Sequence, residues 1–196
     1  MATKAPAAPS ARERLLAAAS ELFYAEGVHT VGIDRVIERA GVAKASLYNT
    51  FGSKDELVRA YLESRHEQTS RRIMRYLGRY SSPRERLLGV FEAQGELFAS
   101  PGFRGCAFVS ASAESPGELV EQAASAYRNW VRTLLVDLAR QAGVGAPEAL
   151  GRQLHMIYDG ASLSARMDHD PTASVAARAA AETLLDAALV VKRLVF

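Results

Sequence analysis

Apolar residues recur at intervals of three and four along nearly the whole chain, the spacing that places them on one face of an α-helix. No segment alternates apolar and polar residues long enough to predict a β-strand. Breaks containing glycine, proline or serine divide the pattern into about nine helical segments. We therefore expect an all-α protein whose helices cover residues 11–27, 33–40, 44–51, 54–77, 83–99, 105–113, 116–141, 147–167 and 172–194.

Several expected helix starts carry a capping box, in which a serine is followed three residues later by a glutamate. The pairs are Ser53 with Glu56, Ser82 with Glu85, and Ser115 with Glu118. Pro83 and Pro116 follow the last two serines, at a position where the missing amide hydrogen would have no helical partner. Ser10 is the expected cap of the first helix, and Gly41 ends the second because glycine readily adopts a left-handed backbone.

A chain of 196 residues can form one substantial core, or one core with a small appended domain. The helix expected over residues 54–77 would span ~36 Å at about 1.5 Å per residue, long enough to connect two domains. We expect a flexible tail over residues 1–9, a three-helix domain over residues 10–54, and a larger helical domain over residues 55–196.

Composition excludes several classes of protein. No run of about 18 apolar residues exists, so we expect no membrane span. The first ten residues lack the apolar segment of a signal peptide. The single cysteine excludes an internal disulfide and fits a reducing cytoplasm.

Charge is distributed unevenly, although the net charge is only +2. Residues 1–80 contain 13 Lys and Arg against 9 Asp and Glu, whereas residues 81–196 contain 11 against 13. A mildly basic first part and a mildly acidic second part are compatible with nucleic-acid binding at the N-terminal end.

The segment "GVAKASLYNTF" at residues 41–51 predicts a short helix with an unusually small outer face. On a helical wheel Leu47 and Phe51 fall on one side, which we expect to be buried. The opposite side carries Ala45, Ser46, Asn49 and Thr50. Lys44 and Tyr48 border that face. Such a face suits the major groove of DNA, where short polar groups reach base edges and a bordering cation and phenol bind phosphates.

The helix over residues 33–40, the glycine-containing turn and the helix over residues 44–51 together predict a helix-turn-helix. Lys54 lies at the start of the following helix, where its ammonium and the free backbone amides can share one phosphate. The alternative is a pair of packed helices with a solvated outer face.

Residues 30–58, "TVGIDRVIERAGVAKASLYNTFGSKDELV", resemble the DNA-binding signature of TetR-family transcriptional repressors. With the first helix included, the resemblance covers residues 10–60. It implies a DNA-binding domain over residues 10–54 and a ligand-binding and dimerisation domain over residues 55–196. It places phosphate contacts on Ser46, Tyr48 and Lys54, and places Lys44, Ala45, Asn49 and Thr50 near the bases.

The sequence departs from the family pattern at four positions in this region. Ala43 stands where the family has a serine or threonine cap, and Ala45 stands where glycine is common. Asn49 and Thr50 replace larger aromatic or imidazole side chains. The mode of binding survives these changes, but the operator sequence does not follow from the resemblance.

Two later helices carry aromatic and polar residues within an apolar stripe, which is typical either of core packing or of a ligand-binding pocket. The residues are Phe91, Gln94 and Phe98 in the first helix and Tyr127, Trp130 and Leu134 in the second. Gln94 is the unusual member because a buried amide without a partner costs roughly 1–3 kcal/mol. Residues 102–115 are similar to a loop and short helix beside the ligand cavity of one TetR subgroup. This similarity implies that Phe103, Cys106 and Phe108 are candidate wall residues, with a redox switch as the alternative role for Cys106.

The helix expected over residues 147–167 has a narrow polar strip that consists of His155, Asp159, Ser162 and Arg166. His155 and Asp159 lie four residues apart on it. They are candidates for a polar pair facing a pocket, for a metal site, or for a solvated or packed pair. Two ligands are a weak metal signal because a structural zinc site needs four. We expect no metal and no cofactor.

The last two helices are apolar around most of their circumference, which predicts that a second copy of the chain covers them. By resemblance they would form a four-helix bundle across a twofold axis. The expected interface residues are Met156, Gly160, Leu163, Met167, Leu184, Ala188 and Val191. The alternative is that the same subunit covers this surface.

These patterns favour a repressor that binds a palindromic operator as a homodimer and is released by a small, largely apolar effector. An activator of the same fold is the alternative. An all-helical enzyme is disfavoured because neither a nucleophile elbow nor a phosphate-binding glycine loop is present in the sequence. An architectural DNA-binding protein is disfavoured by the acidic second part.

Overall fold

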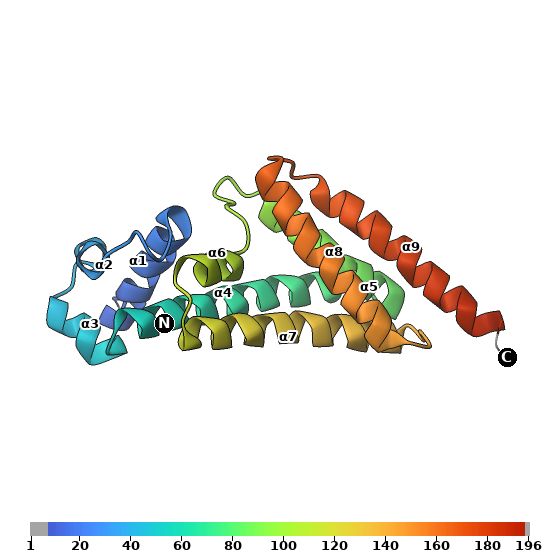
Figure 1. The fold of residues 1–196 in the computed structure, drawn as a ribbon, viewed down its shortest axis with the longest axis horizontal. Helices are drawn as coiled ribbons and strands as arrows, with labels where there is room; N and C mark the ends of the chain where they lie inside the picture. The colour runs from blue at the N-terminus through green and yellow to red at the C-terminus, as the bar shows by residue number, and fades with distance from the viewer. Residues whose placement is uncertain (1–7, 195–196) are drawn as a thin grey trace, which may run out of the picture. The chain divides into compact units, whose positions relative to one another are not determined.

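The computed structural model of the chain describes residues 8–194, with side chains up to residue 190. Most of the expected tail over residues 1–9, and the side chain of Val191, lie outside the described residues. The described residues form nine helices and no strand, which confirms the predicted all-α class (Figure 1). The helices are α1 (Ala11–Glu26), α2 (Ile33–Ala40), α3 (Lys44–Phe51), α4 (Lys54–Leu77), α5 (Pro83–Phe98), α6 (Ala107–Glu114), α7 (Glu118–Gln141), α8 (Pro147–Met167) and α9 (Ala173–Leu194).

The largest differences from the predicted helix bounds lie around α6 and α7. The amide of Ser115 donates to the carbonyl of Ala111 (2.9 Å) and thereby closes the last turn of α6. Ser115 is therefore not the cap of α7, and that predicted capping box is wrong. Instead, the carbonyl of Gly117 accepts from the amide of Glu121 (2.9 Å), so α7 starts two residues later than predicted.

A complete capping box is present at the start of α1. The Ser10 hydroxyl accepts from the amide of Glu13 (3.2 Å), and the Glu13 carboxylate accepts from the amide of Ser10 (2.7 Å). In the boxes predicted at Ser53 and Ser82, the serine accepts from the amide three residues on (3.1 Å in both). There the glutamate pairs with an arginine instead, so only the serine half of the predicted box forms.

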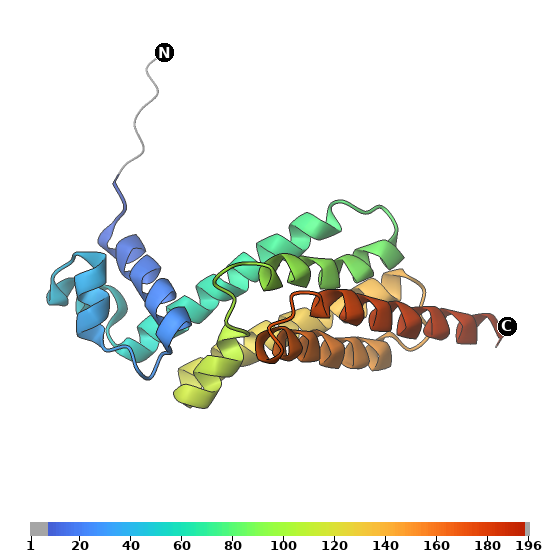
Figure 2. The same cartoon turned by 90° about the horizontal axis from the view of Figure 1, so that it is seen from above.

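The chain divides into two compact units, each of which is discontinuous in sequence. The first contains the residues up to 64 together with residues 107–124. The second contains residues 65–106 together with the residues from 125 onward. The long helices α4 and α7 each contribute to both units (Figure 2). None of the described helices is both long and apolar enough to cross a membrane.

The first unit is built around one small core. Leu15 of α1, Val36 of α2 and Leu47 of α3 are fully buried in it. Gly41 ends α2 with a left-handed backbone (φ 61°), and its carbonyl accepts from Arg14 Nη1 (3.1 Å). The turn between α2 and α3 is thus bound to α1, which fixes the orientation of α3.

In the second unit α9 packs along α5 and α8 (Figure 1). Its buried face consists of Ser174, Ala177, Ala181 and Leu185. Charged residues of α9 border this face and pair with α5: Arg178 with Glu92 (2.9 Å), and Asp186 and Glu182 with Arg84 (2.8 and 2.7 Å). The charged strip of α9 is therefore an interhelical ion-pair network.

Candidate functional site

The outer face of α3 consists of small and short polar side chains. Leu47 is fully buried and Phe51 is half-buried, which orients the helix. Lys44, Ala45, Tyr48, Asn49 and Thr50 are exposed, whereas Ser46 is half-buried. A helix with so little bulk on its outer side can approach a groove closely.

Asn49 and Thr50 offer different hydrogen-bonding groups. The Thr50 hydroxyl donates to the carbonyl of Ser46 (2.6 Å), so the lone pairs of its oxygen and its methyl group remain for an external partner. The Asn49 side chain makes no hydrogen bond with any residue that the structure describes. Its amide can therefore donate and accept at the same time, as recognition of adenine requires.

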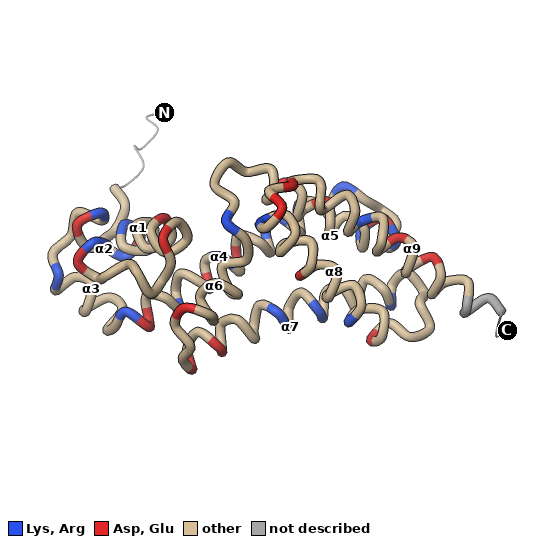
Figure 3. The backbone as a smooth tube through the Cα atoms, turned by 45° about the horizontal axis from the view of Figure 1, so that its top comes forward, with Lys and Arg blue, Asp and Glu red and all other residues tan. Residues whose placement is uncertain are grey.

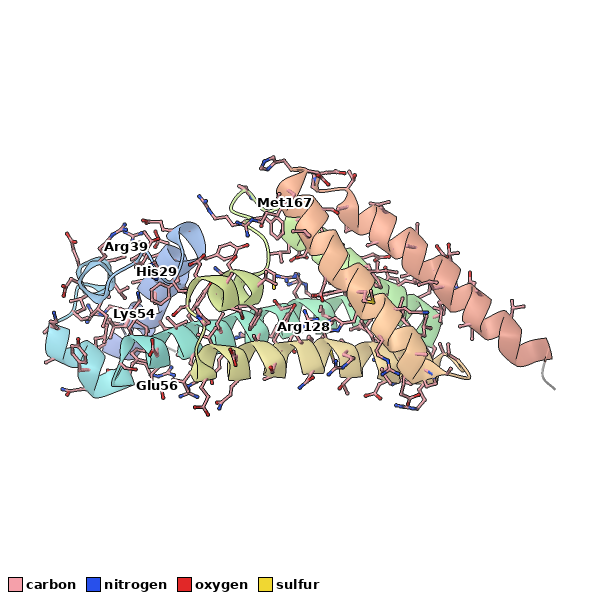
Figure 4. The ribbon with its side chains drawn as sticks, in the orientation of Figure 1. His29, Arg39, Lys54, Glu56, Arg128 and Met167 are labelled. Carbon is pink, nitrogen blue, oxygen red and sulfur yellow. The ribbon has the colours of Figure 1, made fainter. Side chains whose placement is uncertain are left out.

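The two lysines near α3 differ in their pairing. Lys44 Nζ donates to Asp34 Oδ1 of α2 (2.9 Å), and this hydrogen bond raises the pKa of Lys44 above its ordinary value. Lys54 makes no ion pair within the described residues and lies in the first turn of α4, directly after its cap Ser53 (Figure 4). Of the two lysines, Lys54 is thus the one without an ion pair in the described part of the chain. An anion at this place would be favoured both by the Lys54 ammonium group and by the free amides at the positive end of the helix dipole.

Arginines of α2 bind carboxylates of α1. Arg35 pairs with Glu26 (2.6 Å) and Arg39 with Glu21 (2.8 Å), and all four side chains are exposed. Positive and negative residues consequently alternate along these two helices (Figure 3). The residues that remain to attract phosphates are therefore few and lie close to α3.

The end of α6 contacts the turn after α1. A Glu114 carboxylate oxygen accepts from the amide of His29 (3.4 Å), and His29 lies in this turn (Figure 4). Gly27 has a φ of 94°, and a Cβ there would lie 2.4 Å from Glu114 Oε2. This contact within the first unit was not predicted, because no sequence pattern connects residues 27 and 114.

A polar cluster lies between α5, α7 and α8 in the second unit, and Tyr158 is its central member. Gln94 Nε2 donates to the Tyr158 carbonyl (2.9 Å), and the hydroxyls of Tyr127 and Tyr158 share a hydrogen bond (3.1 Å). The Phe91 ring lies edge-on to Tyr158, with centroids 6.4 Å apart. Burial raises the pKa of Tyr158 to about 12 and raises that of Tyr127 well above its ordinary value, so both remain neutral phenols.

Two ligand-site candidates of α7 contact a residue that the sequence interpretation did not assign. The His66 ring of α4 packs against Tyr127 (centroids 5.6 Å apart) and Trp130 (5.2 Å). Burial lowers the pKa of His66, so this imidazole is neutral at pH 7. Trp130 and Leu134 are half-buried. His66 and Tyr158 could have been suspected only from their residue types, because their contacts are long-range.

The remaining candidates are divided between the units. Phe98 and Phe103 pack together with centroids 5.0 Å apart, and Cys106 is half-buried in the same unit. Electrostatic interaction with Cys106 contributes to the raised pKa of both Tyr127 and Tyr158, although burial is the main cause. Phe108 is buried in the first unit.

His155 faces the interior of the second unit, whereas the side chain of the neighbouring Asp159 is partly exposed. His155 is only 5% exposed, and its Nε2 lies 3.8 Å from Asp159 Oδ1. Asp159 is bound by Arg128 of α7 (2.8 Å; Figure 4). Burial lowers the pKa of His155, partly opposed by the charge of Asp159. The described residues contain no group of three or more side chains suited to hold a metal ion.

Another side of α8 carries a row of exposed apolar residues. Met156, Leu163 and Met167 are 74%, 61% and 67% exposed, and Gly160 between them is exposed as well. Met167 marks the C-terminal end of this row (Figure 4). On α9, Leu184 and Ala188 are half-buried. Apolar residues thus lie on two sides of α8: Leu154, Tyr158 and Ala161 are buried within the subunit, whereas this row is exposed.

Comparison with known proteins agrees with this geometry. The sequence profile described as "Bacterial regulatory proteins, tetR family" matches residues 15–61, which include α1 to α3. Two regulators of Mycolicibacterium smegmatis are similar in sequence to part of this chain. The HTH-type transcriptional activator FasR is 39% identical over 82 residues (42% of this chain and 37% of FasR). The HTH-type transcriptional repressor KstR2 is 32% identical over 97 residues (49% and 47%). The chain thus matches less than half the length of these relatives.

A solved structure matches nearly the whole chain. SCO4454, a TetR-family transcriptional regulator from Streptomyces coelicolor, is 36% identical, with a TM-score of 0.84 over 91% of this chain and 95% of SCO4454. The similarity therefore includes both units rather than the helix-turn-helix alone. The chain belongs to the TetR family of DNA-binding, helix-turn-helix transcriptional regulators.

Proposed function

We propose that the protein is a homodimeric repressor, acting in the cytoplasm without catalytic activity, that leaves its operator when a small, largely apolar effector binds. The observation that carries this proposal is the outer face of α3, where short side chains are exposed on a helix held by the buried Leu47. Residues 10–54 would form the DNA-binding domain, and residues 55–196 the effector-binding and dimerisation domain.

DNA contacts would come from α3 and the start of α4. Asn49 and Thr50 would meet base edges, with Lys44 and Ala45 beside them, because they are exposed at the centre of the outer face. Tyr48, Ser46 and Lys54 would bind phosphates and set the depth of insertion. These contacts would make specific binding strongly dependent on salt.

Dimerisation would use the exposed apolar row of α8 together with α9. The row consists of Met156, Gly160, Leu163 and Met167, with Leu184, Ala188 and Val191 on α9. An exposed row of this kind is unfavourable in a monomer, since the transfer of apolar side chains out of water lowers the free energy. A twofold axis through this row would present two copies of α3 to one palindrome.

The effector would bind in the second unit, among the aromatic residues and the polar cluster around Gln94, Tyr127 and His155. It would shift the protein toward a conformation with low affinity for DNA only if it bound that conformation more tightly. Phe91, Phe98, Phe103, Cys106, Trp130, Leu134 and Asp159 remain the other candidates for this site. Phe108, which was predicted with them, belongs to the first unit and is not included.

Activation is the second candidate function, because one of the two similar mycobacterial regulators is named an activator and the other a repressor. A reporter driven by the native promoter, in cells with and without the protein, separates the two. Repression predicts a higher signal without the protein, and activation predicts a lower one.

The test of the proposal is a mobility-shift titration with DNA fragments selected from a random pool by the purified protein. We expect a palindromic consensus, one dimer per site and a steep loss of affinity with salt. Equal affinity for every sequence would overturn the proposal.

A further inference from the structure

The orientation of the Gln94 side chain is fixed by its one hydrogen bond. Its partner is the carbonyl oxygen of Tyr158, which can only accept, so the amino group of Gln94 must point to it (2.9 Å). The amide oxygen Oε1 therefore points elsewhere. It is buried and accepts no hydrogen bond from any residue that the structure describes. Gln94 itself is only 3% exposed.

A buried acceptor without a donor is unfavourable by roughly 1–3 kcal/mol, and such atoms are rare in folded proteins. His155 Nε2 is a second buried atom without a hydrogen bond among the described residues. His155 lies within one helical turn of Tyr158, whose carbonyl holds Gln94. Two such atoms beside one turn of α8 indicate a place built to receive a polar group.

The surroundings of this place are aromatic. The rings of Phe91 and Tyr127 approach Tyr158 from α5 and α7, and His66 and Trp130 extend the aromatic surface from Tyr127. A molecule that reaches Gln94 Oε1 would therefore place its apolar body against rings.

The one acidic group that the structure describes beside the cluster is paired. Asp159 is paired with Arg128, and the imidazole of His155 is neutral at pH 7 because burial lowers its pKa. Arg72 is the cation whose charge acts on Tyr158, and its Nε is buried without a hydrogen bond within the described part of the chain. Glu96, on which Arg72 also acts, is bound by Arg75, and Arg132 acts on His155 as well. The nearby charge is therefore positive on balance and disfavours a cationic ligand. An anion, in turn, would face the Gln94 amide oxygen.

We propose that the effector is an uncharged molecule with an aromatic or aliphatic body and a hydroxyl or N–H group that donates a hydrogen bond to Gln94 Oε1. The inference rests on the proposed function and adds the chemical class of the effector. Gln94 thus selects for a donor, whereas the surrounding rings bind the body without regard to its polar group.

Four probes of similar shape test this class on the full chain: benzyl alcohol, toluene, benzoate and benzylamine. Their dissociation constants are measured at pH 7.5 by isothermal titration calorimetry. We expect benzyl alcohol to bind about ten-fold more tightly than toluene, the effect of one hydrogen bond to a buried acceptor. Benzoate and protonated benzylamine should bind more weakly than benzyl alcohol.

A matched pair of variants assigns the effect to the buried amide. Gln94→Met keeps the length of the side chain and removes the acceptor, so benzyl alcohol and toluene should bind with equal affinity. Gln153→Met makes the same change at an exposed position of α8 and should keep the ten-fold difference. Thermal melting of both variants checks that they are folded, and the comparison of probes on the unmodified chain needs no variant.

Equal affinity of benzyl alcohol and toluene for the unmodified chain would overturn the inference, as would preference for benzoate or no binding of any probe. A preference for benzyl alcohol that persists in Gln94→Met would overturn it too, because a group other than Gln94 Oε1 would then accept the hydrogen bond of the hydroxyl. Operator release is scored separately in the mobility-shift assay. If a small molecule without a hydrogen-bond donor releases the operator, this inference fails and the proposed function stands. If no small molecule of any kind releases the operator, the proposed function fails.

Discussion

Replacing Leu163 by alanine should weaken the dimer while leaving the fold of the subunit intact. Leu163 is 61% exposed on the apolar row of α8. In the proposed dimer that exposed part becomes buried against the second copy. Because only the smaller part of the side chain is covered by its own subunit, the free energy of unfolding of the monomer should fall by no more than about 1 kcal/mol.

The effect on association follows from the buried area. Leucine has three more carbon groups than alanine, at about 0.8 kcal/mol each, or about 2.4 kcal/mol when fully transferred from water. The exposed 61% corresponds to about 1.5 kcal/mol. Each subunit of a twofold dimer contributes one Leu163, so the loss applies twice. The free energy of association should therefore weaken by about 3 kcal/mol, and the dissociation constant should rise about 100-fold.

Sedimentation velocity over a dilution series measures this constant directly. Val109→Ala is the matched control, because Val109 is 59% exposed on α6 and lies outside the proposed interface. The assignment of this row to the interface would be refuted if the dissociation constant of Leu163→Ala changed by less than about three-fold instead of the expected value of about 100-fold. Equal weakening by Val109→Ala would refute it as well.

Asn49→Ala should reduce specific operator binding by about 10-fold to 100-fold with little change in non-specific binding. Lys54→Ala should weaken specific and non-specific binding alike and reduce the salt dependence of the logarithm of the binding constant by about one. The affinities of the two variants are measured by mobility shift at several salt concentrations. Gly27→Ala should lower the free energy of unfolding by about 1–2 kcal/mol in urea titrations, because the backbone there has a φ of 94° and the new Cβ would meet the Glu114 carboxylate. Burial lowers the pKa of His155, so His155 binds a proton more readily in the unfolded chain than in the folded one. The free energy of unfolding should therefore fall as the pH drops below about 6.5. In urea titrations at pH 7.5 and pH 5, His155→Gln should lose less of this free energy than the unmodified chain.

The outcomes that would contradict these predictions are distinct. An unchanged salt slope in Lys54→Ala would remove Lys54 from the phosphate contacts. Unaltered stability of Gly27→Ala would show that the Glu114 contact imposes no constraint on the turn. For His155, a pH dependence identical in the variant and the unmodified chain would assign the acid sensitivity to other groups.

Much of this molecule followed from local sequence. All nine described helices were predicted, because apolar spacing, caps and glycine or proline breaks act within a few residues. The buried position of Leu47 and the outward position of Asn49 followed from the helical wheel for the same reason. The start of α7 was misjudged because Ser115 was claimed by the preceding turn of α6, and the sequence offered both possibilities.

Tertiary structure decided which side of each helix is covered. On α8 it buried His155 and left Leu163 exposed, although the wheel alone treats the polar strip as the side for solvent. It also brought Tyr158 to Gln94, 64 residues away, and so left one amide oxygen without a donor. Helix formation depends on neighbours in sequence, whereas burial and hydrogen-bond partners depend on which distant segments meet, and only the packed chain determines that.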